Sequence, residues 1–96
     1  MNVRYSALAL AELDEILASI AAENPSAAAR FAGRVQRVVL RIGRFPEGAP
    51  KISQRSEVRV VPLVRYPYLI LYTVVADEVM ILRIRHGARR SPWDTA

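Results

Sequence analysis

One histidine lies within a cluster of arginines near the end of the 96-residue chain, where His86 follows Arg85 and precedes Arg89 and Arg90. An imidazole titrates near neutral pH and can transfer a proton, and guanidinium groups stabilise negative charge that develops on a phosphate. Metal-free cleavage of RNA needs both kinds of group. His86 and Arg89 are therefore candidate catalytic residues, together with Arg59 from an earlier predicted strand, which would have to converge with them.

Each of these residues also has an interpretation without catalysis. His86 follows Ile84 on one face of a predicted strand, so it would then cover the rim of the core. The arginines could bind a phosphate or carboxylate of a partner, or form a merely solvated face. An exposed tryptophan often marks a contact surface. The candidate residues for binding a target or another partner are Arg83, Arg85, Arg90 and Trp93.

The composition argues against a metal centre, a cofactor and a membrane span. The chain has no cysteine and one histidine, and no carboxylates cluster near that histidine, so we expect no metal. No apolar run approaches the roughly 20 residues of a membrane-spanning helix. The lack of cysteine suits a reducing compartment. We expect a cytoplasmic protein that requires no cofactor and contacts no membrane.

Positive charge is unevenly distributed along the chain. The formal net charge is +5, and the segment from Pro25 to Lys51 contains six basic residues and one acidic residue. Thirteen of the 14 basic residues are arginine, which favours bidentate recognition of carboxylate or phosphate. An anionic partner is therefore expected, either a nucleic acid or an acidic protein segment.

Two amphipathic helices are predicted in the first half of the chain. Ser6 is a good N-cap for the first helix, which ends near Glu23, and Asn24 with Pro25 predicts that the second helix starts at once. Such a short junction predicts an antiparallel helical hairpin. The expected apolar stripes are Leu10, Leu13, Leu17 and Ile20 in the first helix, and Phe31, Val35, Val38, Ile42 and Phe45 in the second.

A stripe of arginines accompanies the apolar stripe of the second predicted helix. No aromatic residue interleaves with the arginines, so direct binding of nucleic acid is the less favoured interpretation. We expect these side chains to be solvated or to pair with carboxylates of the first helix. The stripe consists of Arg30, Arg34, Arg37, Arg41 and Arg44.

Four strands are predicted from alternating or continuous apolar runs. They cover Asn2 to Tyr5, Glu57 to Val64, Tyr68 to Val75, and Val79 to His86. Pro62 lacks a backbone donor and places the second strand at an edge or marks a bulge, whereas the third strand is apolar on both faces and should be central. Strict alternation in the last strand puts Met80, Leu82, Ile84 and His86 on one face, and Val79, Ile81, Arg83 and Arg85 on the other.

The predicted order is β-α-α-β-β-β within one domain that covers residues 1–96. Such an order implies an α+β fold in which an N-terminal helical hairpin packs on one face of a largely antiparallel, twisted sheet. A chain of 96 residues has room for one core only, and no repeat or domain linker is apparent in the sequence.

Several ordered sequence features resemble the RelE/ParE toxin superfamily of bacterial type II toxin–antitoxin systems over nearly the whole chain. The first half contributes Ala11, Leu13, Ile16, Pro46 and Gly48. The second half contributes Arg59, the sequence Tyr-Leu-Ile-Leu-Tyr at 68–72, and Ile-Arg-His-Gly-Ala-Arg-Arg at 84–90. Each pattern alone is unspecific, and their joint order carries the resemblance. The 68–72 and 84–90 patterns look closer to the ParE branch.

The resemblance implies a toxin that is neutralised by a cognate antitoxin protein. It also implies one of two targets: the ParE branch is associated with poisoning of DNA gyrase, and the other branch cuts mRNA on the ribosome without metal. Leu69 stands where the RelE-like pattern has arginine, Trp93 where a tyrosine is expected, and Lys51 is the only lysine. These departures favour a ParE-like toxin that binds gyrase or another protein, inhibits growth and stabilises plasmids. A RelE-like endoribonuclease and a non-toxic interaction module are the alternatives.

Overall fold

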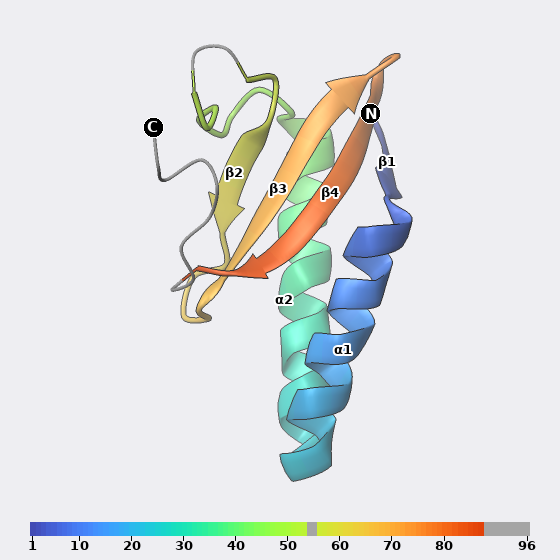
Figure 1. The fold of residues 1–96 in the computed structure, drawn as a ribbon, viewed down its shortest axis with the longest axis vertical. Helices are drawn as coiled ribbons and strands as arrows, with labels where there is room; N and C mark the ends of the chain where they lie inside the picture. Colours follow the sequence, from blue (N-terminus) through green and yellow to red (C-terminus); the bar gives the residue numbers. More distant parts are fainter. Residues whose placement is uncertain (54–55, 88–96) are drawn as a thin grey trace.

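The computed structural model describes residues 1–53 and 56–87 and has the predicted order of elements (Figure 1). The elements are β1 (Asn2–Tyr5), α1 (Ala7–Glu23), α2 (Pro25–Arg44), β2 (Arg59–Pro62), β3 (Tyr68–Val75) and β4 (Glu78–His86). The sheet has the strand order β1-β4-β3-β2, with β1 parallel to β4 and the other neighbours antiparallel. The predicted α+β class, the edge position of β2 and the central position of β3 are confirmed.

Side-chain caps fix the helical hairpin. The Ser6 hydroxyl accepts a hydrogen bond from the backbone N–H of Ala9, and the Asn24 side chain accepts one from Ala27. Pro25 occupies the first turn of α2, where a missing N–H costs nothing. Figure 1 shows both helices on one face of the twisted sheet, with their junction extending beyond the end of the sheet.

The core lies between the helical hairpin and this face of the sheet. Its fully buried side chains include Phe31 and Val35 of α2, Ile70 and Tyr72 of β3, and Ile81 of β4. The predicted stripes were wrong at one position in each helix.

Leu10 is 47% exposed, whereas its neighbour Ala9 is fully buried. In the first turns of α1, the side of the helix that faces the core therefore passes through Ala9 and not through Leu10. Phe45 is 63% exposed, because α2 ends at Arg44 and the backbone at Phe45 is no longer helical, so the helical repeat does not continue through it. Small side chains at a close helix–sheet approach and a cap at a helix end both break an apolar repeat.

A β-bulge in β4 overturns the predicted faces of that strand. Leu71 pairs with Arg83, but Tyr72 pairs with Ile81, so Leu82 is an extra residue in β4. An extra residue reverses the alternation on one side of it. Val79 and Ile81 therefore face the helices together with Ile84, and all three are buried.

Glu12 of α1 completes the edge of β4 where β1 ends. The pairing of β1 with β4 stops at Tyr5 and Ile81. Ser6 then donates its N–H to the Ile81 carbonyl and its hydroxyl to the Leu82 carbonyl, both at 2.9 Å. Further along, the N–H of Ile84 donates to the Glu12 carboxylate at 3.0 Å. Helix α1 thus takes over the edge that a longer β1 would have covered.

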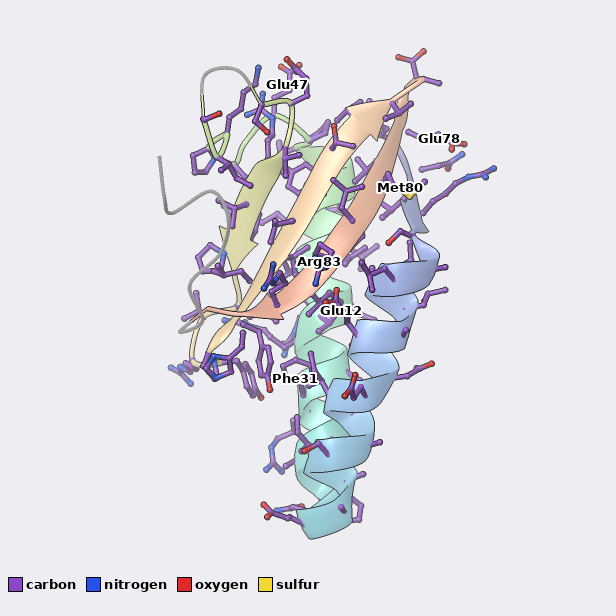
Figure 2. The ribbon with its side chains drawn as sticks, in the orientation of Figure 1. Glu12, Phe31, Glu47, Glu78, Met80 and Arg83 are labelled. Carbon is purple, nitrogen blue, oxygen red and sulfur yellow. The ribbon has the colours of Figure 1, made fainter. Side chains whose placement is uncertain are left out.

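The same carboxylate binds the Arg83 guanidinium. Arg83 Nε lies 3.1 Å from both Glu12 oxygens, and Nη2 lies 2.7 Å from Oε2; Figure 2 shows the two side chains facing each other between α1 and β4. The expectation that carboxylates of α1 pair with arginines of α2 is wrong for Glu12, because its position over the β4 edge directs it to Arg83. Among the described residues, no carboxylate of α1 forms an ion pair with α2.

These contacts lower the pKa of Glu12. Partial burial by itself would raise the pKa of the carboxyl, but the hydrogen bonds from Arg83 and Ile84 and the charges of Arg83 and Arg85 outweigh burial. A carboxyl whose pKa is lower in the folded than in the unfolded chain stabilises the fold above its unfolded pKa, about 4.3, and this stabilisation disappears as pH falls through the folded value.

Glu12→Gln is expected to lower the free energy of unfolding at pH 7 by about 1 to 2 kcal/mol, because a charge-assisted interaction becomes neutral. Urea unfolding at pH 7 and at pH 3 checks this. The difference between variant and parent should shrink towards zero in acid, where the parent loses the same charge. Glu15→Gln on the same helix is the control, with a change below about 0.5 kcal/mol. An equal loss at both pH values would show that Glu12 acts by packing alone.

Candidate functional site

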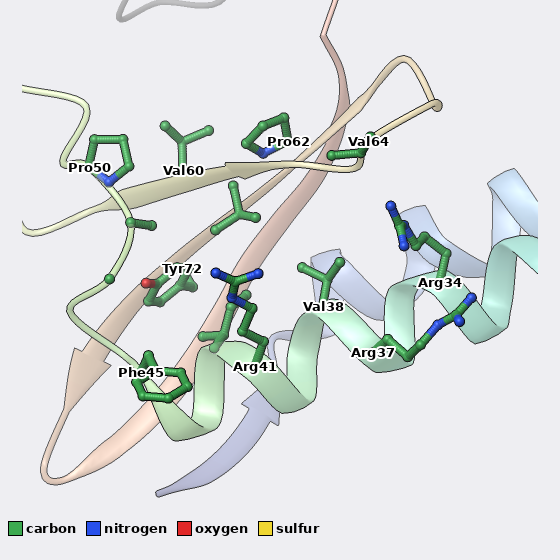
Figure 3. A pocket seen from close by; sticks show the side chains of 14 residues that line it. Arg34, Arg37, Val38, Arg41, Phe45, Pro50, Val60, Pro62, Val64 and Tyr72 are labelled. Atoms are coloured by element: carbon green, nitrogen blue, oxygen red, sulfur yellow. The ribbon is translucent and has the colours of Figure 1, made fainter.

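A groove with a volume of about 660 Å³ runs between α2 and the edge strand β2 (Figure 3). Arg34 and Arg41 extend from α2 towards β2, on either side of Val38, as Figure 3 shows. Val38 and Val61 are partly exposed and give the groove apolar surface, above the buried Ile42 and Tyr72. The lining residues are Arg34, Arg37, Val38, Arg41, Ile42, Phe45, Gly48, Ala49, Pro50, Val60, Val61, Pro62, Val64 and Tyr72.

Two hydrogen-bonding side chains fix the end of the groove near Phe45. The hydroxyl of the buried Tyr72 donates to the Pro46 carbonyl at 2.7 Å. The Nη1 group of Arg59 donates to the carbonyls of Glu47 and Ala49. Both side chains come from the sheet, so they attach the loop after α2 to it.

Burial is the largest influence on the Tyr72 phenol and raises its pKa above the ordinary value, although the nearby positive charge of Arg59 acts in the opposite direction. The phenol therefore remains protonated at neutral pH and keeps its hydrogen bond to the loop.

The outer edge of β2 already has backbone partners. The Val60 N–H donates to the Pro50 carbonyl at 3.1 Å, and the Ile52 N–H donates to the Val58 carbonyl at 2.9 Å. The next outward position of the strand is Pro62, which has no N–H. This edge therefore offers no row of free donors to an added strand.

The groove carries positive charge that is not neutralised within the described residues. The ion pairs among the described residues involve Arg4, Lys51 and Arg83, and none involves an arginine of α2. Arg41 is exposed and Arg34 is partly exposed. The stripe predicted from the sequence is therefore solvated rather than paired, over the part of the chain that the structure describes.

A second hollow, of about 350 Å³, lies between α1 and β4 and contains several predicted site residues. His86 packs edge-on against Tyr68, with the ring centres 5.3 Å apart, and Tyr68 packs in turn against Phe31 at 5.5 Å. His86 thus ends a row of aromatic rings at the rim of the core. Arg83 and Arg85 also line this hollow, opposite the acidic side of α1.

The structure separates two of the three candidate catalytic residues. Arg59 pairs with Tyr72 of β3, whereas His86 pairs with Tyr68, four residues away on the same strand. Four residues of strand span about 13 Å. Arg89, the third candidate, lies outside the described residues, as do the binding candidates Arg90 and Trp93.

Residues of the groove were missed as site residues by the sequence analysis. Arg34, Val38, Arg41 and Phe45 follow one another at spacings of four, three and four, which places them along one side of α2. The mixture of arginine and apolar residues at this spacing was the available signal. Its meaning depended on β2 lying opposite, which no local pattern specifies.

Other classes of site find no support in the described part of the chain. Residues 1–53 and 56–87 contain no group of three or more histidine, cysteine, aspartate or glutamate residues placed to hold a metal ion. Neither described helix has the length and apolar character needed to cross a membrane.

Comparisons with known proteins agree with the fold and with the sequence features. The model of a family described as the ParE toxin of the type II toxin–antitoxin system parDE matches residues 3–91. The chain is 34% identical over 92 residues to the putative toxin Y4kP of Sinorhizobium fredii, covering 95% of this chain and 93% of that protein. It is 39% identical over 82 residues to toxin RelE2 of Caulobacter vibrioides, covering 84% and 89%.

A solved structure described as the chromosomal ParDE TA system from P. aeruginosa contains a chain with the same fold. The TM-score is 0.78 at 26% identity, and the match covers 90% of this chain and 95% of that chain. Family model, relatives and fold all extend over most of the molecule. The chain therefore belongs to the ParE family of toxins of type II toxin–antitoxin systems.

Proposed function

We propose that this toxin inhibits growth by binding a protein target such as DNA gyrase, in the bacterial cytoplasm, and that a cognate antitoxin protein neutralises it. The observation that supports binding of a protein target, rather than catalysis, is the separation of Arg59 from His86. A general base must come within about 3 Å of the proton that it removes, and the cation must contact the same phosphate.

The separation of the two residues disfavours a catalytic role for this pair. The Nη1 group of Arg59 is directed to loop carbonyls at one end of the groove. His86 packs on Tyr68 at the other end of β3. Binding of a protein target requires no convergence of these groups.

Two separate observations support neutralisation by an antitoxin: the similarity to a chain of a ParDE system and the groove beside α2. The similar P. aeruginosa chain belongs to a ParDE toxin–antitoxin system. On this chain, a groove lined by apolar residues and by three arginines of α2 is open to a partner. Surfaces of this composition are common at protein interfaces, where arginine is enriched.

An mRNA endoribonuclease that acts on the ribosome is the second candidate. The name RelE2 of the Caulobacter relative favours it. So does the hollow beside β4, which holds His86 together with Arg85. In this alternative His86 would transfer the proton, and the arginines would bind the phosphate.

The purified toxin is expected to inhibit DNA supercoiling by gyrase and to leave mRNA intact in a ribosome-dependent translation reaction. Parallel assays on the same preparation check this, with the toxin–antitoxin complex as the inactive control. Cleavage of mRNA without any effect on gyrase would contradict the proposal. Folded toxin that leaves growing cells unharmed in the absence of antitoxin would identify the third alternative, a non-toxic interaction module.

His86→Gln is expected to leave growth inhibition unchanged, because the proposed function assigns no proton transfer to the imidazole. Growth after induced expression, with equal toxin levels confirmed by immunoblot, checks this. Thermal unfolding provides the structural control, since loss of the ring contact with Tyr68 should cost about 0.5 to 1.5 kcal/mol. If the variant keeps its fold and loses all toxicity, catalysis by His86 becomes the better explanation.

A further inference from the structure

We infer that Arg34 and Arg41 determine the specificity of the groove for its partner: they select an acidic, amphipathic helix that carries two carboxylates seven residues apart. The inference rests on the proposed neutralisation by an antitoxin and names the chemistry that the neutralising segment needs. Three properties of the groove carry it.

The groove combines unburied apolar surface with unneutralised charge. Phe45 and Val64, at its two ends, are 63% and 59% exposed, and Val38 between the arginines is partly exposed. Neither Arg34 nor Arg41 has an ion-pair partner among residues 1–53 and 56–87. An occupant that fits must cover apolar side chains and supply negative charge along one rim.

The backbone of β2 restricts the occupant to a helix. Its outward N–H at Val60 is already bonded to Pro50, and Pro62 has none. An added strand would therefore leave its own carbonyl groups without donors, whereas a helix satisfies its backbone internally.

The spacing of the arginines sets the spacing of the carboxylates. Arg34 and Arg41 are seven residues apart on α2, a rise of about 10 Å, and Val38 lies between them. Carboxylates at positions i and i+7 of a helix aligned with α2 have the same separation. The groove from Arg34 to Phe45 is about 16 Å long and accommodates about three turns.

A nucleic acid fits this surface less well. Its phosphates would meet the arginines, but nothing in it would cover the aliphatic floor made by Val38 and Val61. Single-stranded nucleic acids stack successive bases on aromatic side chains. Of the two aromatic residues that line the groove, Tyr72 is buried and Phe45 is exposed at one end, and the side chain between Arg34 and Arg41 is that of Val38.

Designed helical peptides test the inference on the full-length toxin. One fluorescent 15-residue peptide carries leucines on one face and two glutamates seven residues apart. A second has the same composition with the glutamates five residues apart, and a third has lysines in place of the glutamates. A single-stranded oligonucleotide of similar length is the fourth probe. Fluorescence anisotropy measures the binding of each.

The first peptide is expected to bind at least about tenfold more tightly than the second, and the third should not bind. Arg34→Glu with Arg41→Glu should weaken binding of the first peptide by at least about tenfold and should allow the lysine peptide to bind. Arg30→Glu with Arg44→Glu, two exposed arginines of α2 outside the groove lining, is the matched control and should change affinity by less than about threefold. Arg34→Gln with Arg41→Gln serves as a second variant if the reversed charges impair folding.

Equal binding of the first two peptides, or equal loss in the control variant, would overturn the inference. So would an oligonucleotide that binds more tightly than any peptide and depends on Arg34 and Arg41. Peptide binding is measured without gyrase, ribosomes or growing cells. Failure of the toxin to inhibit gyrase would therefore contradict the proposed function and leave the specificity of the groove intact.

Discussion

The arrangement of the molecule depends on how α1 closes the free edge of β4. Strand β1 covers this edge only as far as Ile81, so the backbone of the second half of β4 needs other partners. Ser6 and Glu12 provide them through the Leu82 carbonyl and the Ile84 N–H. Because Glu12 also binds Arg83, one carboxylate satisfies a backbone donor and a guanidinium at the same edge.

This closure makes the two sides of the helical layer different. On the side of α1, the helix packs directly against β4 and carries a paired, partly buried charge. On the side of α2, the space next to β2 stays open as a groove, and the arginines there have no ion-pair partners among the described residues. The closed side stabilises the fold, and the open side is available to other molecules.

Local sequence signals predicted the elements but not how they face one another. The caps at Ser6 and Asn24 and the donor missing at Pro62 act within a few residues, and their consequences are confirmed. The bulge at Leu82 depends on pairing with β3, so strict alternation gave wrong faces for Val79 and Ile81. The contacts of Arg59 with the loop after α2 likewise join segments about ten residues apart. The residue type alone therefore suggested a catalytic role, whereas the structure shows that Arg59 holds this loop against the sheet.

The positive charge along α2, on the open side of the molecule, affects both partner binding and stability. Six basic residues and one acidic residue lie between Pro25 and Lys51, whereas the partly buried carboxylate of α1 is engaged at the β4 edge. Like charges along α2 repel one another, which costs stability as long as no anion is near. A helix that brings carboxylates to Arg34 and Arg41 removes part of this repulsion and covers the apolar floor in the same step. Binding and stability of the toxin are therefore linked, because any partner that prefers the folded chain raises its free energy of unfolding.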